Sequence, residues 1–426
     1  MTLFELYKKC GLRVTTDSRA IQGGEIFFAL KGENFDGNQY AMQALESGAE
    51  YAVVSNDAGL PDDSRLIKVD DPFKALQELA VEYRKSLNIP VIGLTGTNGK
   101  TTTKELIREV LSKKFNVSAT KGNLNNDIGV PLTVLSIPSD AQIAVVEMGA
   151  SHPDDIAKLV PISRPDYGLI TNVGKAHLLG FGSFEGVKAA KGELYKWLGS
   201  HEGSRIFLNA DDKVLSEMAS KEACHVWSYG LNYQGAEVLP SSAEEPYLRI
   251  RLGNDTVNTL LVGAYNATNV LAAIAVGEFF GVSRKDAIDA IASYVPSNAR
   301  SQMVRKESNT LIVDAYNANP SSMSAALDNF ATVESDSKWA LLGDMRELGE
   351  DSGTEHRKIV ERLSRENLNA YLVGDEFRKA AEGTSFKCFD TSDELAEFLK
   401  SAPLSSSVVL VKGSRGIRME KVLDVL

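Results

Sequence analysis

Cysteine is scarce in this chain of 426 residues, which has only Cys10, Cys224 and Cys388. The three are far apart in the sequence, odd in number and without a Cys-x-x-Cys pair. This usage argues against a disulfide framework and a zinc site, and it is typical of a reducing compartment. We therefore expect free thiols packed in the protein core.

Long apolar runs are missing as well. No segment approaches the roughly 20 apolar residues that a membrane-spanning helix needs. The N-terminal stretch carries Glu5, Lys8, Lys9 and Arg13 and holds no apolar stretch of signal-peptide length. We expect a cytoplasmic protein without membrane insertion.

Blocks of basic residues are also absent. The chain has 46 lysines and arginines and 57 aspartates and glutamates, for a formal net charge of −11. A nucleic-acid-binding surface is therefore not expected, and an anionic nucleotide must be captured by a local site. The chain does have an ordinary content of 43% apolar and 24% charged residues, without repeats or low-complexity tracts. At about 150 residues per domain, its length suggests three domains.

Residues 1–86 are predicted to form a small α/β domain. Apolar residues from Phe73 to Tyr83 recur at helical spacing, whereas the other apolar runs have the length of strands. The expected strands and helix are Glu25–Leu30, Tyr51–Ser55, Arg65–Val69 and Pro72–Lys85.

Residues 87–296 alternate apolar runs with helical patterns, which predicts a parallel sheet covered by helices on both faces. In segment 230–262, clusters of Gly, Pro, Ser and Glu surround short β stretches and predict an antiparallel addition to that sheet. The expected strands are Val91–Leu94, Gln142–Glu147, Tyr167–Asn172, Arg205–Asn209, Tyr247–Leu252 and Val257–Val262.

Residues 297–426 again run from strand to helix and predict a second doubly wound, Rossmann-like unit. The predicted fold class is therefore α/β with three domains: a small α/β domain, a central P-loop domain with a parallel sheet, and a C-terminal Rossmann-like domain. The strands expected in the third domain are Leu311–Asp314, Trp339–Leu342, Ala370–Val373 and Val408–Val411.

The run VIGLTGTNGKTTT at 91–103 predicts a buried strand, a tight glycine turn and a helix start. Gly96 and Gly99 let backbone N–H groups converge on phosphate oxygens at the positive end of the helix. Lys100 adds a point charge, and Thr101 a hydroxyl for Mg²⁺. The general GxxxxGK[ST] pattern fails because a leucine stands where its first glycine belongs, but the shorter TGTNGKTT form fits. A phosphate site is predicted, with a plain connecting turn as the alternative; its residues are Gly96, Thr97, Asn98, Gly99, Lys100, Thr101 and Thr102.

Polar residues that directly follow an apolar run lie at the carboxyl ends of strands, where open α/β sheets bind ligands. Glu147 ends one run and is predicted to hold Mg²⁺ beside the phosphates, with a buried structural glutamate as the alternative. His177 follows another run and is open between a ligand and a structural hydrogen-bonding residue. Lys191 lies with Lys188 and Lys196 on an expected helix, where lysines are typically solvated surface charges.

Three polar loops follow strands of the third domain: 314–320, 343–344 and 412–415. Asn and Asp favour a tight turn in the first, and its proline can start a helix. We expect the loops to converge on one edge of the sheet, where Lys412 and Arg415 would hold an anion near the ATP site. Loops with solvated charges are the alternative.

Together these segments resemble the Mur ligase family, the ATP-dependent enzymes that form amide bonds in peptidoglycan assembly. The similarity covers almost the whole chain and is greatest to the members that add D-alanyl-D-alanine to UDP-N-acetylmuramoyl-tripeptide through an acyl phosphate. No Asp-Asn-Pro-Arg-like motif, expected of the diaminopimelate- or lysine-adding relatives, occurs in the third domain. The matching segments are 16–19, 29–32, 95–102, 123–131, 147–149, 171–173, 177, 190–193, 314–320 and 342–349.

The resemblance implies roles for single residues. Lys100 would contact the phosphates, Thr101 and Glu147 would bind one Mg²⁺, and His177 would bind a second. Lys191 would be carbamylated by CO₂, which turns a cation into a carboxylate-like metal ligand. The catalytic residues implied are Lys100, Glu147, His177 and Lys191.

The resemblance also implies where the substrates bind. Asn266 and Asn269 would lie on the adenine side, Arg300 at the start of the third domain, and Asp314 near the nucleotide. The UDP-sugar would lie on the first domain and the dipeptide on the third, in a protein expected to be a monomer. The substrate-binding residues implied are Ser18, Arg19, Asn125, Asn126, Tyr316, Asn317 and Asn319.

Two residues depart from the family pattern, because Tyr265 and Asn38 stand where many members have histidine. Neither change touches the phosphate or metal chemistry. Other functions remain open at this point: a ligase that adds a single amino acid to another UDP-muramoyl peptide, a folate-type glutamate ligase, a P-loop ATPase that forms no amide, or a silent nucleotide-binding scaffold.

Overall fold

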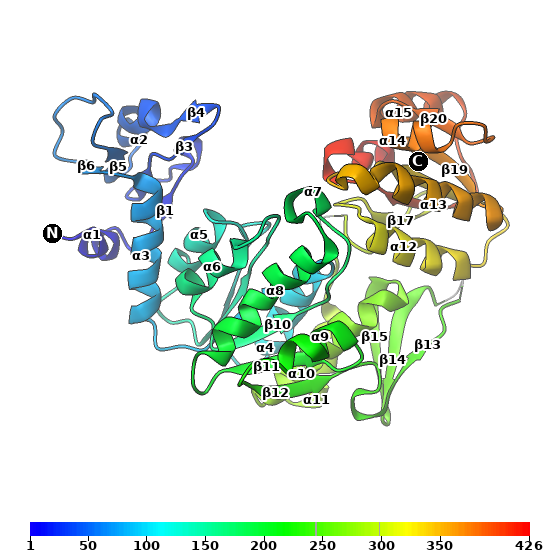
Figure 1. The fold of residues 1–426 in the computed structure, drawn as a ribbon, viewed down its shortest axis with the longest axis horizontal. Helices are drawn as coiled ribbons and strands as arrows, with labels where there is room; N and C mark the ends of the chain where they lie inside the picture. Colours follow the sequence, from blue (N-terminus) through cyan, green and yellow to red (C-terminus); the bar gives the residue numbers. More distant parts are fainter. Residues whose placement is uncertain (243–244, 298) are drawn as a thin grey trace.

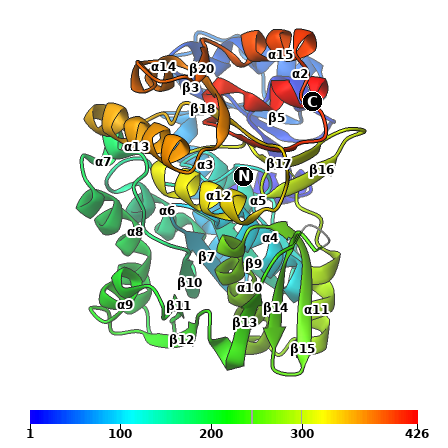
Figure 2. The same cartoon turned by 90° about the vertical axis from the view of Figure 1, so that its right-hand side faces the viewer.

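The computed structural model describes residues 1–242, 245–297 and 299–426 of the chain. The N-terminal and C-terminal α/β units lie on the same side of a larger central unit (Figures 1 and 2). Among the described helices, none has the length and apolar content to cross a membrane. The α/β fold class with three parallel-sheet units is confirmed, while the proposed limits 1–86, 87–296 and 297–426 stay a prediction.

The first unit contains a four-stranded parallel sheet in the order β1-β2-β5-β6. The expected helix begins at Pro72. Asp71, the residue before it, caps the helix by accepting a hydrogen bond from the Phe73 N–H at 2.8 Å. Two further helices, α1 and α2, were not predicted. The elements are α1 Leu3–Lys9, β1 Val14–Thr15, β2 Ile26–Phe28, β3 Lys31–Gly32, β4 Phe35–Asp36, α2 Ala41–Glu46, β5 Tyr51–Ser55, β6 Leu66–Val69 and α3 Pro72–Ser86.

Helices α1 and α3 join the first unit to the central one, because their apolar side chains belong to the same core cluster as helices of the central unit. Tyr7 on α1 donates its hydroxyl hydrogen to the Leu135 carbonyl at 2.5 Å, and Tyr83 on α3 donates to Ile137 at 2.6 Å. Arg84 Nε donates to the Ser163 carbonyl at 2.9 Å. Helix α3 is therefore anchored in the central unit, and Figure 1 shows it connecting the two.

The central unit is built on a parallel sheet in the order β12-β11-β10-β7-β9-β8. Successive residues of β9 face opposite sides: Val146 packs with α5, α6 and α8, and Val145 with α4 and α10. Both faces are covered by helices, as predicted. The elements are β7 Val91–Thr95, α4 Lys100–Leu111, β8 Val117–Ala119, α5 Gly129–Leu135, β9 Ile143–Glu147, α6 Asp155–Ser163, β10 Tyr167–Ile170, α7 Leu178–Phe181, α8 Phe184–Gly199, β11 Arg205–Asn209, α9 Lys213–Ala219, β12 His225–Tyr229, α10 Ala267–Phe279 and α11 Arg284–Ser293.

The antiparallel segment forms a separate sheet of its own, which corrects the expectation that it would extend the parallel sheet. Its strands are β13 Ala236–Leu239, β14 Tyr247–Leu252 and β15 Asp255–Val262, and residues 243–244 of the expected segment lie outside the described residues. Ile250 and Val257 pack in the same core cluster as α10 and α11, and this packing places the small sheet beside the helices.

The third unit has a sheet in the order β16-β17-β21-β18-β19-β20, parallel except for the edge strand β16. Helices α12, α13 and α14 cover one face, and α15 covers the other. The four strands predicted here are present. The elements are β16 Gln302–Arg305, β17 Thr310–Asp314, α12 Pro320–Thr332, β18 Lys338–Gly343, α13 Ser352–Arg365, β19 Asn369–Val373, α14 Asp375–Ala380, β20 Lys387–Phe389, α15 Ser392–Ser401 and β21 Val408–Lys412.

Candidate active site

A cavity of about 800 Å³ lies between the central and third units. Its central-unit wall is formed by the loop after β7 and the segments at the ends of β9 and β10, and its third-unit wall by the loops after β17 and β18, the start of α12 and the last residue of β21. The predicted site residues line it with five exceptions: Gly96, Lys191, Ser18, Arg19 and Arg415. The structure thus brings together residues separated by more than 200 positions in the chain, such as Asn98 and Asn319.

The loop after β7 has the geometry of a phosphate cradle. Gly99 is left-handed at φ 78°, and a Cβ there would lie 2.7 Å from Asn269 Oδ1. A Cβ at Gly96 would lie within 1.9 Å of Thr171 Oγ1. Both positions therefore require glycine. Helix α4 starts directly after Gly99, so its free N–H groups and positive end face the cavity.

Lys100 folds back over this loop, and its ammonium group donates to the carbonyls of Gly96 at 2.8 Å and Thr97 at 3.0 Å. Burial lowers the pKa of Lys100, which Glu147 opposes and Arg300 reinforces. The loop itself is fixed by the two residues that follow β10: the Asn98 N–H donates to Asn172 Oδ1 at 3.0 Å, and Thr171 Oγ1 donates to the Asn98 carbonyl at 2.6 Å.

Glu147 stands at the end of β9 with one carboxylate oxygen bound and one free. Its Oε1 accepts from Thr101 Oγ1 at 3.3 Å and from Asn125 Nδ2 at 2.8 Å. Within the described residues, its buried Oε2 has no hydrogen-bond partner. A buried carboxylate oxygen without a partner costs free energy, and a divalent cation would remove that cost. Thr101 and Glu147 therefore fit a Mg²⁺ ion.

His177 precedes α7 and has a left-handed backbone at φ 51°. Its Nδ1 lies 2.5 Å from Oε2 of Glu347, which belongs to the third unit. Burial lowers the pKa of His177, Lys100 and Lys191 add to the lowering, and Glu347 opposes it. Across the described chain, no group of three or more His, Cys, Asp or Glu side chains suits a metal ion. A cation at this site would need hydroxyl, phosphate or modified-lysine oxygens as well.

Lys191 is buried, with 2% of its surface exposed, so the sequence-based interpretation of this lysine as a solvated surface charge is wrong. It lies on the core side of α8 and donates to the Ala150 carbonyl at 3.3 Å. Ala150 lines the cavity, so Lys191 lies directly behind the cavity wall. Burial lowers the pKa of Lys191 to about 7, and the nearby charge of Lys100 contributes.

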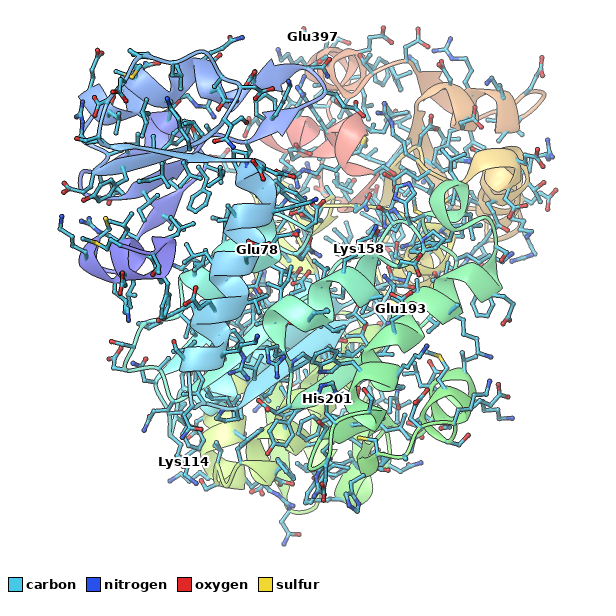
Figure 3. All side chains as sticks on the ribbon, turned by 60° about the vertical axis from the view of Figure 1, so that its left-hand side comes forward. Glu78, Lys114, Lys158, Glu193, His201 and Glu397 are labelled. Carbon is cyan, nitrogen blue, oxygen red and sulfur yellow. The ribbon has the colours of Figure 1, made fainter. Side chains whose placement is uncertain are left out.

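The helix α6 beside this site is held by Glu193, two residues after Lys191. The Glu193 carboxylate accepts from the Ala157 N–H at 2.7 Å and from the Asp154 N–H at 3.2 Å. Figure 3 shows Glu193 on α8 and Lys158 on the neighbouring α6. The same short stretch of α8 therefore carries Lys191 and fixes the start of α6.

Asn266 and Asn269 are buried in a hydrogen-bond network beneath the phosphate loop. Asn269 Nδ2 donates to Asn266 Oδ1 at 3.0 Å, and Asn269 Oδ1 accepts from Thr103 Oγ1 at 3.0 Å. Tyr265, one of the departures from the family pattern, shares a hydrogen bond of 3.1 Å with Ser301. The other, Asn38, accepts from the Ser55 N–H at 3.0 Å and lies in the first unit, outside the cavity.

Lys412 is paired with Asp314 at 2.6 Å and only 1% of its side chain is exposed. This corrects the expectation that Lys412 would hold an anion, because its charge is already balanced. Its ammonium group also donates to the Asn317 carbonyl at 3.2 Å and so braces the loop after β17. Asp314 lines the cavity, but as the partner of a lysine.

The loop after β17 faces the phosphate loop. Asn319 caps α12 and donates to Asn98 Oδ1 at 2.8 Å. The Tyr316 ring lies 3.6 Å from the Arg300 guanidinium carbon and accepts a hydrogen bond at its hydroxyl from Arg415 at 3.1 Å. Arg415 therefore contacts Tyr316 from outside the cavity lining, and its role toward an anion stays a prediction.

Several cavity residues were missed by sequence reasoning. Arg346 and Glu347 line the cavity but were included only as part of a segment that matches the family. Asn125 and Asn126, by contrast, were predicted and do line it. Ser321, at the start of α12, lies within 3.4 Å of Asn98 Nδ2 and gave no signal. Ser18 and Arg19 lie in the first unit, where exposed Arg19 pairs with Asp17 at 2.8 Å.

Comparisons with known proteins agree with this geometry. Three family models match the chain: "Mur ligase family, catalytic domain" over residues 13–91, "Mur ligase middle domain" over 94–277, and "Mur ligase, glutamate ligase domain" over 299–415.

Two curated relatives carry the name UDP-N-acetylmuramoyl-tripeptide–D-alanyl-D-alanine ligase. The Bacillus subtilis protein is 35% identical and the Escherichia coli protein 36% identical, each covering 97% of this chain, with 92% and 93% of the relatives covered. The crystal structure of MurF ligase from Thermotoga maritima in complex with ADP has a TM-score of 0.85 at 28% identity and covers 100% of this chain and 98% of that chain.

Proposed function

The chain belongs to the Mur ligase family, and we propose that it is the ATP-dependent, ADP-forming ligase that adds D-alanyl-D-alanine to UDP-N-acetylmuramoyl-tripeptide in peptidoglycan synthesis. The observation that carries this proposal is the identity of 35% and 36%, over nearly the full length, to two ligases named for that reaction. A phosphate loop and a third-unit loop that meet in one cavity support it.

The reaction must activate a carboxylate, because a carboxylate and an amine do not condense in neutral water. The terminal carboxylate of the tripeptide attacks the γ-phosphorus of ATP, which gives an acyl phosphate and ADP. The amine of D-alanyl-D-alanine then attacks the acyl carbon, loses a proton and expels inorganic phosphate. The N–H groups of the loop 96–99 and the Lys100 ammonium bind the phosphates, and fixed donors of this kind stabilise charge without reorganising.

Mg²⁺ is part of the proposal: Thr101 and Glu147 would hold one ion, and His177 with carbamylated Lys191 a second. When bound, these ions supply positive charge that offsets the charge of the phosphate oxygens. The unpartnered Glu147 Oε2 supports the first site. The neutral amine that burial favours at Lys191 supports carbamylation, because only an amine with a free lone pair reacts with CO₂.

The three units would divide the binding. Residues 1–86 would hold the UDP-sugar at Ser18 and Arg19, 87–296 the nucleotide, and 297–426 the dipeptide at Tyr316, Asn317 and Asn319. Asn266, Asn269 and Arg300 would surround the base, and Asn125 and Asn126 the peptide end of the UDP substrate. We further propose that the protein acts as a monomer and that it is cytoplasmic, since the described cysteines are free.

The decisive experiment measures phosphate release from ATP in the presence of UDP-N-acetylmuramoyl-tripeptide, with and without D-alanyl-D-alanine, and follows the pentapeptide product by mass. We expect release that needs both substrates and matches product one for one. Lys100→Ala should abolish release, whereas Lys113→Ala, an exposed lysine after the same helix, should release phosphate like the wild type.

Each alternative predicts a different result. Release that needs a single amino acid instead of the dipeptide would indicate a related UDP-muramoyl peptide ligase. Sustained release without any amine would indicate an ATPase that forms no amide. Wild-type release by Lys100→Ala would contradict the phosphate site itself.

A further inference from the structure

The third unit contains a fully buried histidine, His356, whose two ring nitrogens are both engaged. Nδ1 lies 2.8 Å from the Ser352 carbonyl one turn earlier on α13. Nε2 lies 3.0 Å from the backbone nitrogen of Met345, in the loop after β18. The ring also packs edge-on against Phe377, with centroids 4.6 Å apart.

These contacts fix the protonation state of the ring in this structure. A carbonyl only accepts, so Nδ1 must carry the hydrogen that goes to Ser352. The Met345 N–H only donates, so Nε2 must offer its lone pair. His356 is therefore neutral and in the Nδ1–H form. Asp344, 3.7 Å away, instead accepts the N–H groups of Glu376 and Phe377 at the start of α14.

The loop that His356 holds is bound by three different elements through successive N–H groups. The Asp344 N–H donates to Val373 on β19 at 2.9 Å, Met345 to His356 on α13, and the Arg346 N–H to Ser414 Oγ after β21 at 2.8 Å. We call residues 344–347 the docking arm. It is held as a rigid unit at its base, and its far end lines the cavity.

The far end of the docking arm contacts the central unit. Glu347 has a left-handed backbone at φ 66°; its carboxylate lies 2.5 Å from His177 and its carbonyl accepts the Leu179 N–H at 3.2 Å. A left-handed glutamate is strained and persists only where surrounding contacts hold it. The hydrogen bond between His356 and the Met345 N–H, two residues before Glu347, is such a contact.

We propose that His356 is a positioning residue for the proposed ligase reaction: by accepting the Met345 N–H it sets the docking arm so that Glu347 meets His177 when the third unit covers the cavity. His356 touches no substrate and acts only through the arm. The inference rests on the proposed function for its kinetic consequence. The hydrogen bond from the Met345 N–H to His356, which we call the clamp, is independent of any reaction.

Three substitutions separate the clamp from simple core packing. His356→Gln places an amide oxygen near the position of Nε2 and keeps the acceptor for Met345. His356→Asn is too short to reach Met345 and keeps only the group near Nδ1. His356→Leu keeps side-chain bulk and removes both. The decisive comparison is Gln against Asn, because both are neutral amides.

The first measurement is amide hydrogen exchange of segment 343–349 without substrates. Losing the acceptor for a buried N–H should speed exchange of Met345 about tenfold in Asn and Leu, whereas Gln should match the wild type. The second is steady-state kinetics: kcat should fall about two- to fivefold in Asn and Leu, no more than the contact between Glu347 and His177 is worth, while the KM for ATP stays within about twofold, since the phosphate loop lies on another unit.

The results discriminate clearly. If Gln is as impaired as Asn and Leu in both measurements, the ring serves only as core packing and the proposal is wrong. If Asn and Leu keep wild-type exchange, the clamp does not exist. If the wild type forms no product while exchange follows the expected pattern, the proposed function fails but the clamp stands.

Discussion

The proposed reaction of Lys191 with CO₂ needs its side-chain amine in the neutral form, and its surroundings favour that form. The carbamate forms when the amine lone pair attacks the carbon of CO₂ and a proton leaves. Burial and Lys100 both disfavour the ammonium form of Lys191, so its pKa falls to about 7 from the usual 10.5. Lys188, on the same helix, instead pairs with Glu217 at 3.3 Å near the surface.

We predict that Lys191 takes up CO₂ and that uptake depends on pH. Below pH 7 the ammonium form dominates and has no lone pair, so carbamate should form poorly at pH 6 and well at pH 8 for equal dissolved CO₂. A ¹³C carbamate signal from labelled bicarbonate should appear in the wild type and in Lys188→Met but not in Lys191→Met. Lys191→Ala should lose activity and regain part of it with short carboxylates; no rescue at any concentration would contradict the role of the carbamate.

The burial of Lys191 was visible in the sequence, although its place on a lysine-bearing helix favoured a surface interpretation. It stands four residues after Val187 and three before Leu194, both buried, and so falls on the apolar stripe of α8. No comparable sequence pattern predicted the contact between His177 and Glu347. These residues are 170 positions apart and belong to different units, and no local pattern reports a pairing of that range.

Among the elements, the turn from β7 to α4 forms the phosphate loop and contains two positions, Gly96 and Gly99, that leave no room for a Cβ. Gly99 and Gly203 have nearly the same φ, 78° and 82°. A Cβ at Gly99 would press on Asn269 Oδ1, whereas a Cβ at Gly203 meets nothing within 4 Å. The pair therefore separates the cost of the backbone angle from the cost of the contact.

We predict that Gly99→Ala and Gly203→Ala each lose about 1–2 kcal/mol of unfolding free energy through the backbone angle, because both force alanine into the left-handed region, and that Gly99→Ala loses more because its Cβ also presses on Asn269. Only Gly99→Ala should also weaken binding of an ATP analogue, by about tenfold or more, since Asn269 and the loop must move apart. Urea unfolding and titration calorimetry measure the two effects. Equal analogue affinities in the two variants would show that the loop tolerates a Cβ.

At this scale the sequence predicts strands well and connections less well. Each run that was expected to be a strand is one, since strands buried on both faces leave continuous apolar segments, as in β7 and β9, and half-buried strands such as β14 leave alternating ones. Helix α1 was missed although Thr2 and Glu5 form a capping box that the Thr-x-x-Glu pattern announces. The separate sheet β13-β14-β15 was misplaced because its packing on α10 and α11 is a tertiary feature.

In the whole molecule, the third unit meets the central unit through apolar packing of Val262 and Tyr247 on its core and through polar contacts around the cavity. Asn319 bonds Asn98 at 2.8 Å, Lys175 lies 3.3 Å from Glu355, and Glu347 meets His177. Figure 1 shows α7, which follows His177, reaching toward the third unit. Contacts of this kind are individually weak, so a few of them permit the cavity to open for substrates and close for the reaction.

We predict that Glu347→Ala shifts the molecule toward an open arrangement of the third unit. The Glu347 side chain is 57% exposed and that of His177 is 32% exposed, and the lowered pKa of His177 favours a neutral ring, so the two form a solvent-screened, hydrogen-bonded pair. Such a pair is worth about 0.2–1 kcal/mol, which changes the ratio of closed to open molecules about 1.4- to fivefold. Small-angle X-ray scattering should show a larger radius of gyration, and kcat should fall by a similar factor.

Glu350→Ala is the matched control, because Glu350 is an exposed acid three residues further along the chain, in the short 3-10 helix Gly349–Asp351. It changes the net charge equally but lacks the contact to His177, so its scattering and kcat should equal those of the wild type. If Glu350→Ala opens the molecule as much as Glu347→Ala, total charge governs closure. If neither variant changes the scattering, the remaining contacts hold the unit closed and Glu347 contributes nothing to closure.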